Sequence, residues 1–105
     1  MHTLVVNFNL KDMTDDEFRQ FCDEVAPTFA AVPGLVQKVW LADEATNTYG
    51  GVYTFKDRAA FEAYTRSELF QSVASNANFV AITARDYGVL DGPTRVTGGL
   101  GAVAV

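Results

Sequence analysis

Cysteine and histidine are nearly absent from this chain of 105 residues, which has one of each, Cys22 and His2. A single cysteine cannot form a disulfide within the chain. A metal site built from histidine and cysteine would lack ligands, so we expect no bound metal. A nucleophilic Cys22 would need a base, and the sequence offers only His2. We therefore interpret Cys22 as part of an apolar core.

Basic residues are also few. The eight Lys and Arg are scattered singly against 13 Asp and Glu, and the net charge is -5. A nucleic-acid-binding protein would show a basic stripe, and an anionic membrane surface would repel this chain. No apolar run approaches the ~20 residues that span a bilayer. The first residues, MHTLVVNFNL, lack a basic region and a cleavage site. We expect a cytoplasmic protein with no nucleic-acid or membrane partner.

Cofactor-binding motifs are missing as well. The glycine pairs 50–51 and 98–99 lack the spacing of a phosphate loop, and no flavin or nicotinamide fingerprint is present. We expect no cofactor. The pair 50–51 is more typical of a strand bulge or of a close approach by another backbone.

Aromatic residues are plentiful, with eight Phe, four Tyr and one Trp. They are enough to fill a core, line an apolar pocket or seal a subunit interface. The length favours one domain over residues 1–105, in which about 91–105 form a Gly-rich C-terminal tail.

The apolar pattern predicts strands at 3–10, 35–42, 49–55 and 79–90, the last with Ala81, Thr83, Arg85 and Tyr87 on one side. Between the first two strands, a capping box predicts the start of a helix; its residues are Thr14 and Glu17. Pro27 predicts a kink or an early end of this helix.

A second helix is expected after the third strand. Asp57 is placed to cap it, and Ser67 marks a point at which it can be interrupted.

The element order β-α-β-β-α-β predicts a ferredoxin-like α+β subunit, an antiparallel sheet with two helices on one face. Strand 3–10 has residues suited to burial on both faces: Leu4, Val6, Phe8 and Leu10 on one, Thr3, Val5, Asn7 and Asn9 on the other. Helices can cover only one face. We therefore expect the other to pack against a second copy of the chain, giving a homodimer.

The stretch PGLVQKVWLADEATNTYGGVYTFKDRAAFEAY resembles the YdhR family of monooxygenases, within the dimeric α+β-barrel superfamily of antibiotic-biosynthesis monooxygenases. The resemblance lies in Pro33-Gly34-Leu35, Lys38-Val39-Trp40, Gly50-Gly51-Val52-Tyr53, Phe55 and Ala63-Tyr64. It implies a dimeric α+β barrel with an apolar pocket between the sheet and the helices of each subunit. It also implies oxidation of a small aromatic or polyketide-like substrate by O2 without a cofactor.

Lys38 and Trp40 are two residues apart on one strand, so they share a face. In a dry pocket the pKa of Lys38 falls, and the amine can stabilise a phenolate or enolate. Alternatively, Lys38 pairs with an acid at the dimer surface while Trp40 packs in the interface. Both interpretations remain open at this point.

Three further catalytic candidates are Asn7, Tyr64 and Arg85, and the expected substrate-binding residues are Tyr53, Tyr87, Phe61 and Val5. Each has a structural alternative: a strand amide for Asn7, a core ring for Tyr64, an ion pair for Arg85. The resemblance extends to haem-degrading relatives, in which a strand asparagine works with an aromatic residue and an iron-binding histidine of the second helix. Asn7 fits the first position, and Tyr64 lies near the second, where those relatives carry Trp. Ala74 occupies the third position in place of the histidine, which disfavours haem degradation.

Three functions are therefore open. The first is a cofactor-independent monooxygenase. The second is a non-oxidative isomerase or cyclase that uses the same pocket. The third is a non-catalytic small-molecule-binding or stress protein. Dependence on O2 separates the first from the second, and saturable turnover separates both from the third.

Overall fold

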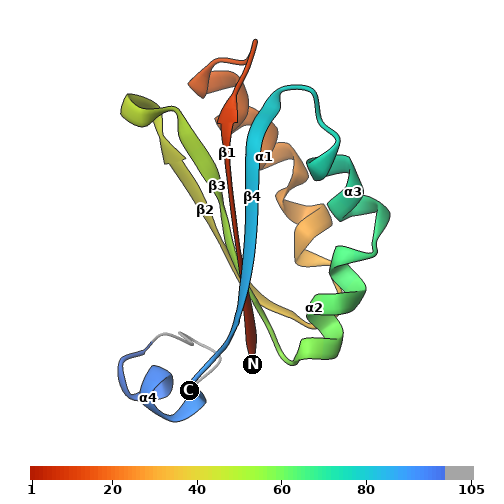
Figure 1. Ribbon diagram of the computed structural model, residues 1–105, viewed down its shortest axis with the longest axis vertical. Coiled ribbons are helices and arrows are strands. Elements are labelled where there is room, and N and C mark those ends of the chain that lie inside the picture. Colours follow the sequence, from red (N-terminus) through yellow and green to blue (C-terminus); the bar gives the residue numbers. More distant parts are fainter. Residues whose placement is uncertain (99–105) are drawn as a thin grey trace.

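A computed structural model describes residues 1–98 of the chain (Figure 1). One curved sheet carries α1, α2 and α3 on the same face, whereas α4 lies beyond the end of β4, on the other side of the sheet. The elements are β1 (His2–Leu10), α1 (Asp15–Ala30), β2 (Leu35–Asp43), η1 (Glu44–Thr46), β3 (Thr48–Phe55), α2 (Arg58–Thr65), α3 (Glu68–Ala74), β4 (Phe79–Gly88) and α4 (Asp91–Val96).

The strands are ordered β2-β3-β1-β4, and every neighbouring pair is antiparallel. This order and the helices on one face confirm the predicted ferredoxin-like α+β fold. The second predicted helix is divided as expected at Ser67, whose hydroxyl caps α3 by accepting from the amide of Phe70 at 3.2 Å.

The capping box at the start of α1 is present. The Glu17 amide donates to the Thr14 hydroxyl at 3.1 Å, and the Thr14 amide donates to a Glu17 carboxylate oxygen at 2.9 Å. A third contact ties this end of the helix to the sheet, because the Tyr49 hydroxyl donates to Asp15 at 2.6 Å. This hydrogen bond raises the pKa of Tyr49 to about 12.

Of the two outcomes predicted at Pro27, a kink or an early end of the helix, the early end is wrong, since α1 continues to Ala30. Proline removes one helical hydrogen bond, but tertiary packing can hold the turn that follows. Here Phe29, only 4% exposed, packs under β2 with its ring centroid 5.3 Å from that of Trp40. Burial of Phe29 therefore explains why the last turn persists.

The strand β4 contains an irregularity that the sequence pattern did not predict. Ala81 has φ +54°, and the pairing of β4 with β1 shifts so that Val80 lies opposite Asn9 and Thr83 opposite Asn7. Ala81 is the extra residue of this bulge and does not share the face of Thr83, as the alternating pattern had predicted. Arg85 and Tyr87 do share it.

The strand β4 ends at Gly88, two residues before the predicted end at 90. The short helix α4 lies inside the predicted tail, and the rest of that tail, residues 99–105, falls outside the described residues.

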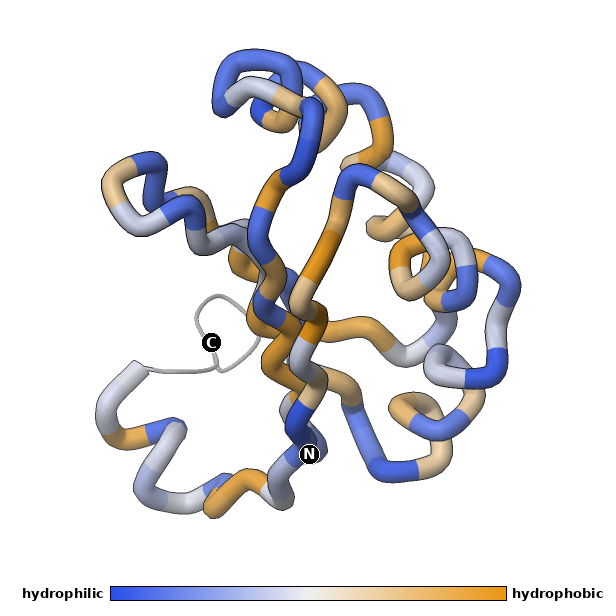
Figure 2. The backbone as a smooth tube through the Cα atoms, turned by 45° about the horizontal axis from the view of Figure 1, so that its top comes forward, coloured by the Kyte–Doolittle hydropathy of each residue, from blue (hydrophilic) through white to orange (hydrophobic). Residues whose placement is uncertain are grey.

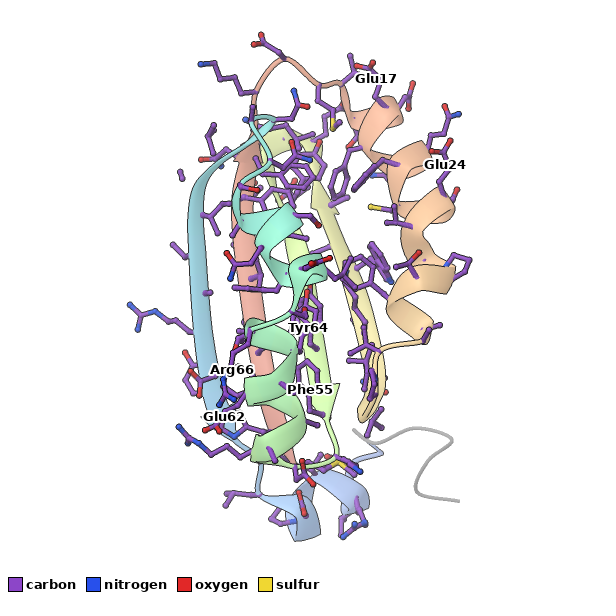
Figure 3. The ribbon with its side chains drawn as sticks, turned by 90° about the vertical axis from the view of Figure 1, so that its right-hand side faces the viewer. Glu17, Glu24, Phe55, Glu62, Tyr64 and Arg66 are labelled. Atoms are coloured by element: carbon purple, nitrogen blue, oxygen red, sulfur yellow. The ribbon has the colours of Figure 1, made fainter. Side chains whose placement is uncertain are left out.

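The core lies between the sheet and α1 to α3. Hydrophobic residues follow the strands through the middle of the molecule, and hydrophilic ones gather at the turns (Figure 2). Figure 3 shows Phe55 and Tyr64 between α2 and the strands, with Glu17 and Glu24 on the outer side of α1. No helix within residues 1–98 is long and apolar enough to cross a membrane.

Candidate functional site

Lys38 and Trp40 lie on the face of β2 that is covered by α1. The register sets this orientation, because Lys38 is paired with Tyr53 and Trp40 with Gly51 on the neighbouring strand β3. Paired residues of antiparallel strands share a face, and Tyr53 is buried in the core with 3% of its surface exposed. The two side chains therefore enter the space between the sheet and α1.

The Lys38 amine lies among three aromatic rings. Its Nζ is 3.4 Å from the ring centroid of Phe29, 3.4 Å from that of Trp40 and 4.6 Å from that of Tyr53. Within residues 1–98, no carboxylate forms an ion pair with it. The interpretation of Lys38 as one half of a surface ion pair thus finds no partner among the described residues of this chain.

Burial lowers the pKa of Lys38 to about 7, and the nearby Cys22 thiol has a smaller, opposite effect. The apolar surroundings disfavour the ammonium form, since few groups there can replace its hydration. The three ring faces act in the other direction, because each attracts a cation. Near neutral pH this residue can both accept and return a proton.

Gly51 leaves the room that the Lys38 side chain occupies. A Cβ atom at position 51 would lie 3.0 Å from Cε of Lys38 and 3.4 Å from Cε1 of Tyr53. Gly51 of the double glycine therefore leaves room for the Lys38 side chain beside the ring of Tyr53.

The amine borders a cavity of about 30 Å³, which has room for roughly one or two water molecules. Trp40 lines this cavity and also two larger surface hollows, of about 550 and 360 Å³. The cavity is lined by Phe8, Phe18, Phe21, Cys22, Phe29, Lys38, Trp40, Gly50, Tyr53, Val73 and Phe79.

Tyr64 lies behind the first layer of the site, with ring centroids 5.3 Å from Tyr53 and 6.5 Å from Phe29. It is 2% exposed, and its hydroxyl has no hydrogen bond of good geometry within the described residues. Burial raises the pKa of Tyr64, and the nearby Tyr53 hydroxyl raises it further. Burial likewise raises the pKa of Tyr53. Both phenols therefore remain proton donors over the physiological pH range.

Four predicted residues do not join this cavity. Val5, Asn7, Arg85 and Tyr87 lie on the opposite face of the sheet, because Asn7 is paired with Gly50 and Val5 with Arg85. Arg85 is exposed, as is Tyr87 at 53%. The expectation that Asn7 and Arg85 surround the same pocket as Lys38 is therefore not met within one chain. The reason is that successive side chains of a strand point to opposite faces of the sheet, and these residues lie on the face opposite to Lys38.

Phe61 also lies away from the amine. Its ring centroid is 4.7 Å from that of His2 and 6.0 Å from that of Phe55, and it does not line the cavity beside Lys38. The structure thus brings together Lys38, Trp40 and Tyr53, with Tyr64 behind them.

Sequence reasoning missed Phe29 as a site residue and assigned Cys22 to the core alone. Both line the cavity with Lys38. The signal was available in the apolar stripe of α1, because a helix that covers the Lys38 face of the sheet must present that stripe to the amine. For Cys22, burial raises the pKa of the thiol and Lys38 partly offsets that rise.

Three solved structures illustrate the likeness of this fold to known proteins. NE2512 of Nitrosomonas europaea, a protein of unknown function, has 18% identity and a TM-score of 0.69, covering 85% of this chain and 88% of that one. A mutant of SnoaB, a cofactor-independent oxygenase of Streptomyces nogalater, has 22% identity and a TM-score of 0.67, covering 85% and 92%.

The third structure is a mutant of MhuD with two manganese protoporphyrin IX molecules bound per active site. It has 13% identity and a TM-score of 0.67, covering 86% and 95%. At these identities the likeness concerns the fold alone. No curated protein sequence matches the chain.

A family model gives the more specific result. The model described as "Putative mono-oxygenase ydhR" matches residues 3–100, which include the four strands except the first residue of β1, and also the side chains around Lys38. The chain belongs to the ydhR family of monooxygenases.

Proposed function

We propose that this protein is a cofactor-independent monooxygenase that oxidises a small aromatic or polyketide-like substrate with O2. The observation that supports this most directly is the Lys38 amine, held among three aromatic rings without a carboxylate partner in residues 1–98. Family membership supports oxygen chemistry, and SnoaB, of the same fold, is a cofactor-independent oxygenase.

The neutral Lys38 amine would take a proton from a phenolic or enolisable substrate. The resulting carbanion transfers one electron to O2, and the substrate radical and superoxide combine into a peroxide anion. The Lys38 ammonium returns its proton to that anion. Loss of water from the hydroperoxide then leaves a new carbonyl group, so one oxygen atom enters the product and the other leaves as water.

The exclusion of water from the site around Lys38 favours these steps. Apolar walls exclude water and strengthen the attraction between the Lys38 ammonium and the substrate anion. The aromatic rings beside the amine can also pack against a planar substrate. The buried Tyr64 hydroxyl, which has no hydrogen bond of good geometry within the described residues, and the nearby Tyr53 hydroxyl offer donors for a substrate oxygen.

Oxygen uptake tests the proposal. We expect the metal-free protein to consume O2 with at least one member of a panel of anthrones, hydroquinones and other easily oxidised phenols. The rate should saturate with substrate, and Lys38→Met should lower it by roughly 10²-fold or more, the usual contribution of a positioned base.

The matched control is Lys11→Met, which removes an exposed lysine that does not line the cavity and should leave the rate unchanged. Turnover of an enolisable substrate without O2 uptake would instead favour an isomerase or cyclase in the same pocket. No saturable turnover of any panel member would favour the binding protein.

We also propose that the chain forms a homodimer through the face of the sheet that α1 to α3 leave open. Val39, 46% exposed, lies on this face beside Val52, and half-buried Val5 lies on it in β1. An apolar sheet face of this kind favours association with its own copy. Asn7 and Arg85 would then lie at the interface.

Sedimentation velocity is expected to show a dimer at micromolar concentration. Val39→Lys should raise the dimer dissociation constant by roughly tenfold or more, because an unpaired charge would be buried. Lys11→Met again serves as the control. A stable wild-type monomer at micromolar concentration would contradict the dimer.

A further inference from the structure

We propose that the Lys38 amine is also a nucleophile, which forms an imine with small apolar aldehydes or ketones that reach the aromatic site. This activity requires neither O2 nor proton abstraction from the substrate, so it goes beyond the oxygenase proposed above.

The placement of the three lysines carries the inference. Lys11 and Lys56 are exposed to solvent, whereas Lys38 is half-buried with its Nζ against the rings of Phe29 and Trp40. No acid pairs with it in the part of the chain that the structure describes. A primary amine in such a setting keeps its lone pair available, because neither an ion pair nor full hydration holds it in the ammonium form. The lowered pKa of Lys38, about 7, agrees with this.

The same rings suit the product of the reaction. A protonated imine is a delocalised cation, and the faces of Phe29, Trp40 and Tyr53 would stabilise it as they stabilise the ammonium. The apolar cavity also favours loss of water from the first adduct.

The bond changes are those of ordinary imine formation. The Nζ lone pair attacks the carbonyl carbon, the C=O π bond breaks onto oxygen, and a proton moves from nitrogen to oxygen to give a carbinolamine. The hydroxyl group then takes a proton from solvent and leaves as water while the nitrogen lone pair forms the C=N bond, which gives the protonated imine; release of the N–H proton to solvent gives the neutral imine, so the net change is loss of one water molecule. Nothing is oxidised or reduced.

Access to the amine comes from the surface side. Lys38 lines the hollow of about 360 Å³ between α1 and β2 as well as the inner cavity of about 30 Å³. A four-carbon aldehyde can approach from this hollow without entering the inner space. Larger carbonyl compounds would require Trp40, which lines both, to move.

The experiment is reductive trapping in the wild-type protein. Butanal is added at about pH 7, where exposed lysines are almost wholly protonated, and cyanoborohydride reduces any imine to a stable butyl amine. Peptide mass spectrometry then compares Lys38 with Lys11 and Lys56. We expect at least tenfold more butylation at Lys38 in the folded protein. In denaturant, the three lysines should react equally, which shows that the selectivity depends on the fold.

Equal or lower labelling of Lys38 in the folded protein would overturn the proposal. The comparison is made within one wild-type chain, so the result does not depend on whether a variant folds. The two proposals also fail separately. Selective butylation of Lys38 without O2 uptake would support imine formation and contradict the oxygenase. O2 uptake without selective butylation would support the oxygenase and contradict imine formation.

Discussion

We expect Lys38→Met to be more stable than the wild-type protein at about pH 6, with a free energy of unfolding that changes less with pH. A substitution that removes a group from a well-packed core normally destabilises it, so a gain would be informative. The reason lies in the burial of the amine. Methionine has a similar length, fits apolar surroundings and carries no charge.

The direction of this pH dependence follows from the number of protons that Lys38 binds in the folded and unfolded states. The pKa of Lys38 is about 7 in the folded protein against an ordinary value of 10.5. Below about pH 7 both states hold the proton, and the folded state bears the penalty of a buried ammonium. Between the two values the unfolded chain binds more protons, so wild-type stability rises with pH by up to about 1.4 kcal/mol per unit. Between the two pKa values the free energy of unfolding of the wild-type protein rises on the order of several kcal/mol. The Lys38→Met variant should show no such rise.

Urea unfolding of both proteins between about pH 6 and pH 9 measures the difference. Lys11→Met is the control, because an exposed lysine should keep the wild-type pH dependence. A Lys38→Met variant that is less stable at about pH 6 would show that the amine is paired, as the dimer-surface alternative requires.

The sequence predicted the fold because its local signals agreed with one another. The capping box at Thr14 and the break at Ser67 are both present. The prediction that Lys38 and Trp40 share one face of their strand is also confirmed, and these two residues mark the candidate site.

The predictions that the structure does not support depended on contacts between segments that are distant in sequence. The residues of one strand face can be grouped from sequence, but which face the helices cover is decided by packing. Asn7 was grouped with Lys38 for that reason, although it lies on the other face. The bulge at Ala81 arises from its pairing with β1, and no neighbour in sequence signals it. Phe29 likewise holds the turn after Pro27 through contacts with β2.

The second large effect is expected at Gly50. We predict that Gly50→Ala lowers the free energy of unfolding by about 3 kcal/mol or more, since a Cβ there would meet backbone rather than a movable side chain. That atom would lie 1.8 Å from the Val6 carbonyl oxygen and 3.0 Å from the Cα of Asn7. The φ of Gly50, +152°, adds strain for any other residue. Neither contact can relax without moving β3 away from β1.

Thermal unfolding followed by circular dichroism would measure the loss, with Gly88→Ala as the control. A Cβ at Gly88 meets nothing within 4 Å, so that variant should stay within about 0.5 kcal/mol of wild type. Gly50 also lines the cavity beside Lys38, and β3 carries Tyr53. Displacing β3 should therefore lower the selectivity of Lys38 butylation in whatever protein remains folded. If Gly50→Ala were as stable as Gly88→Ala, the close approach of β1 and β3 would be refuted, and with it the placement of Tyr53 beside the amine.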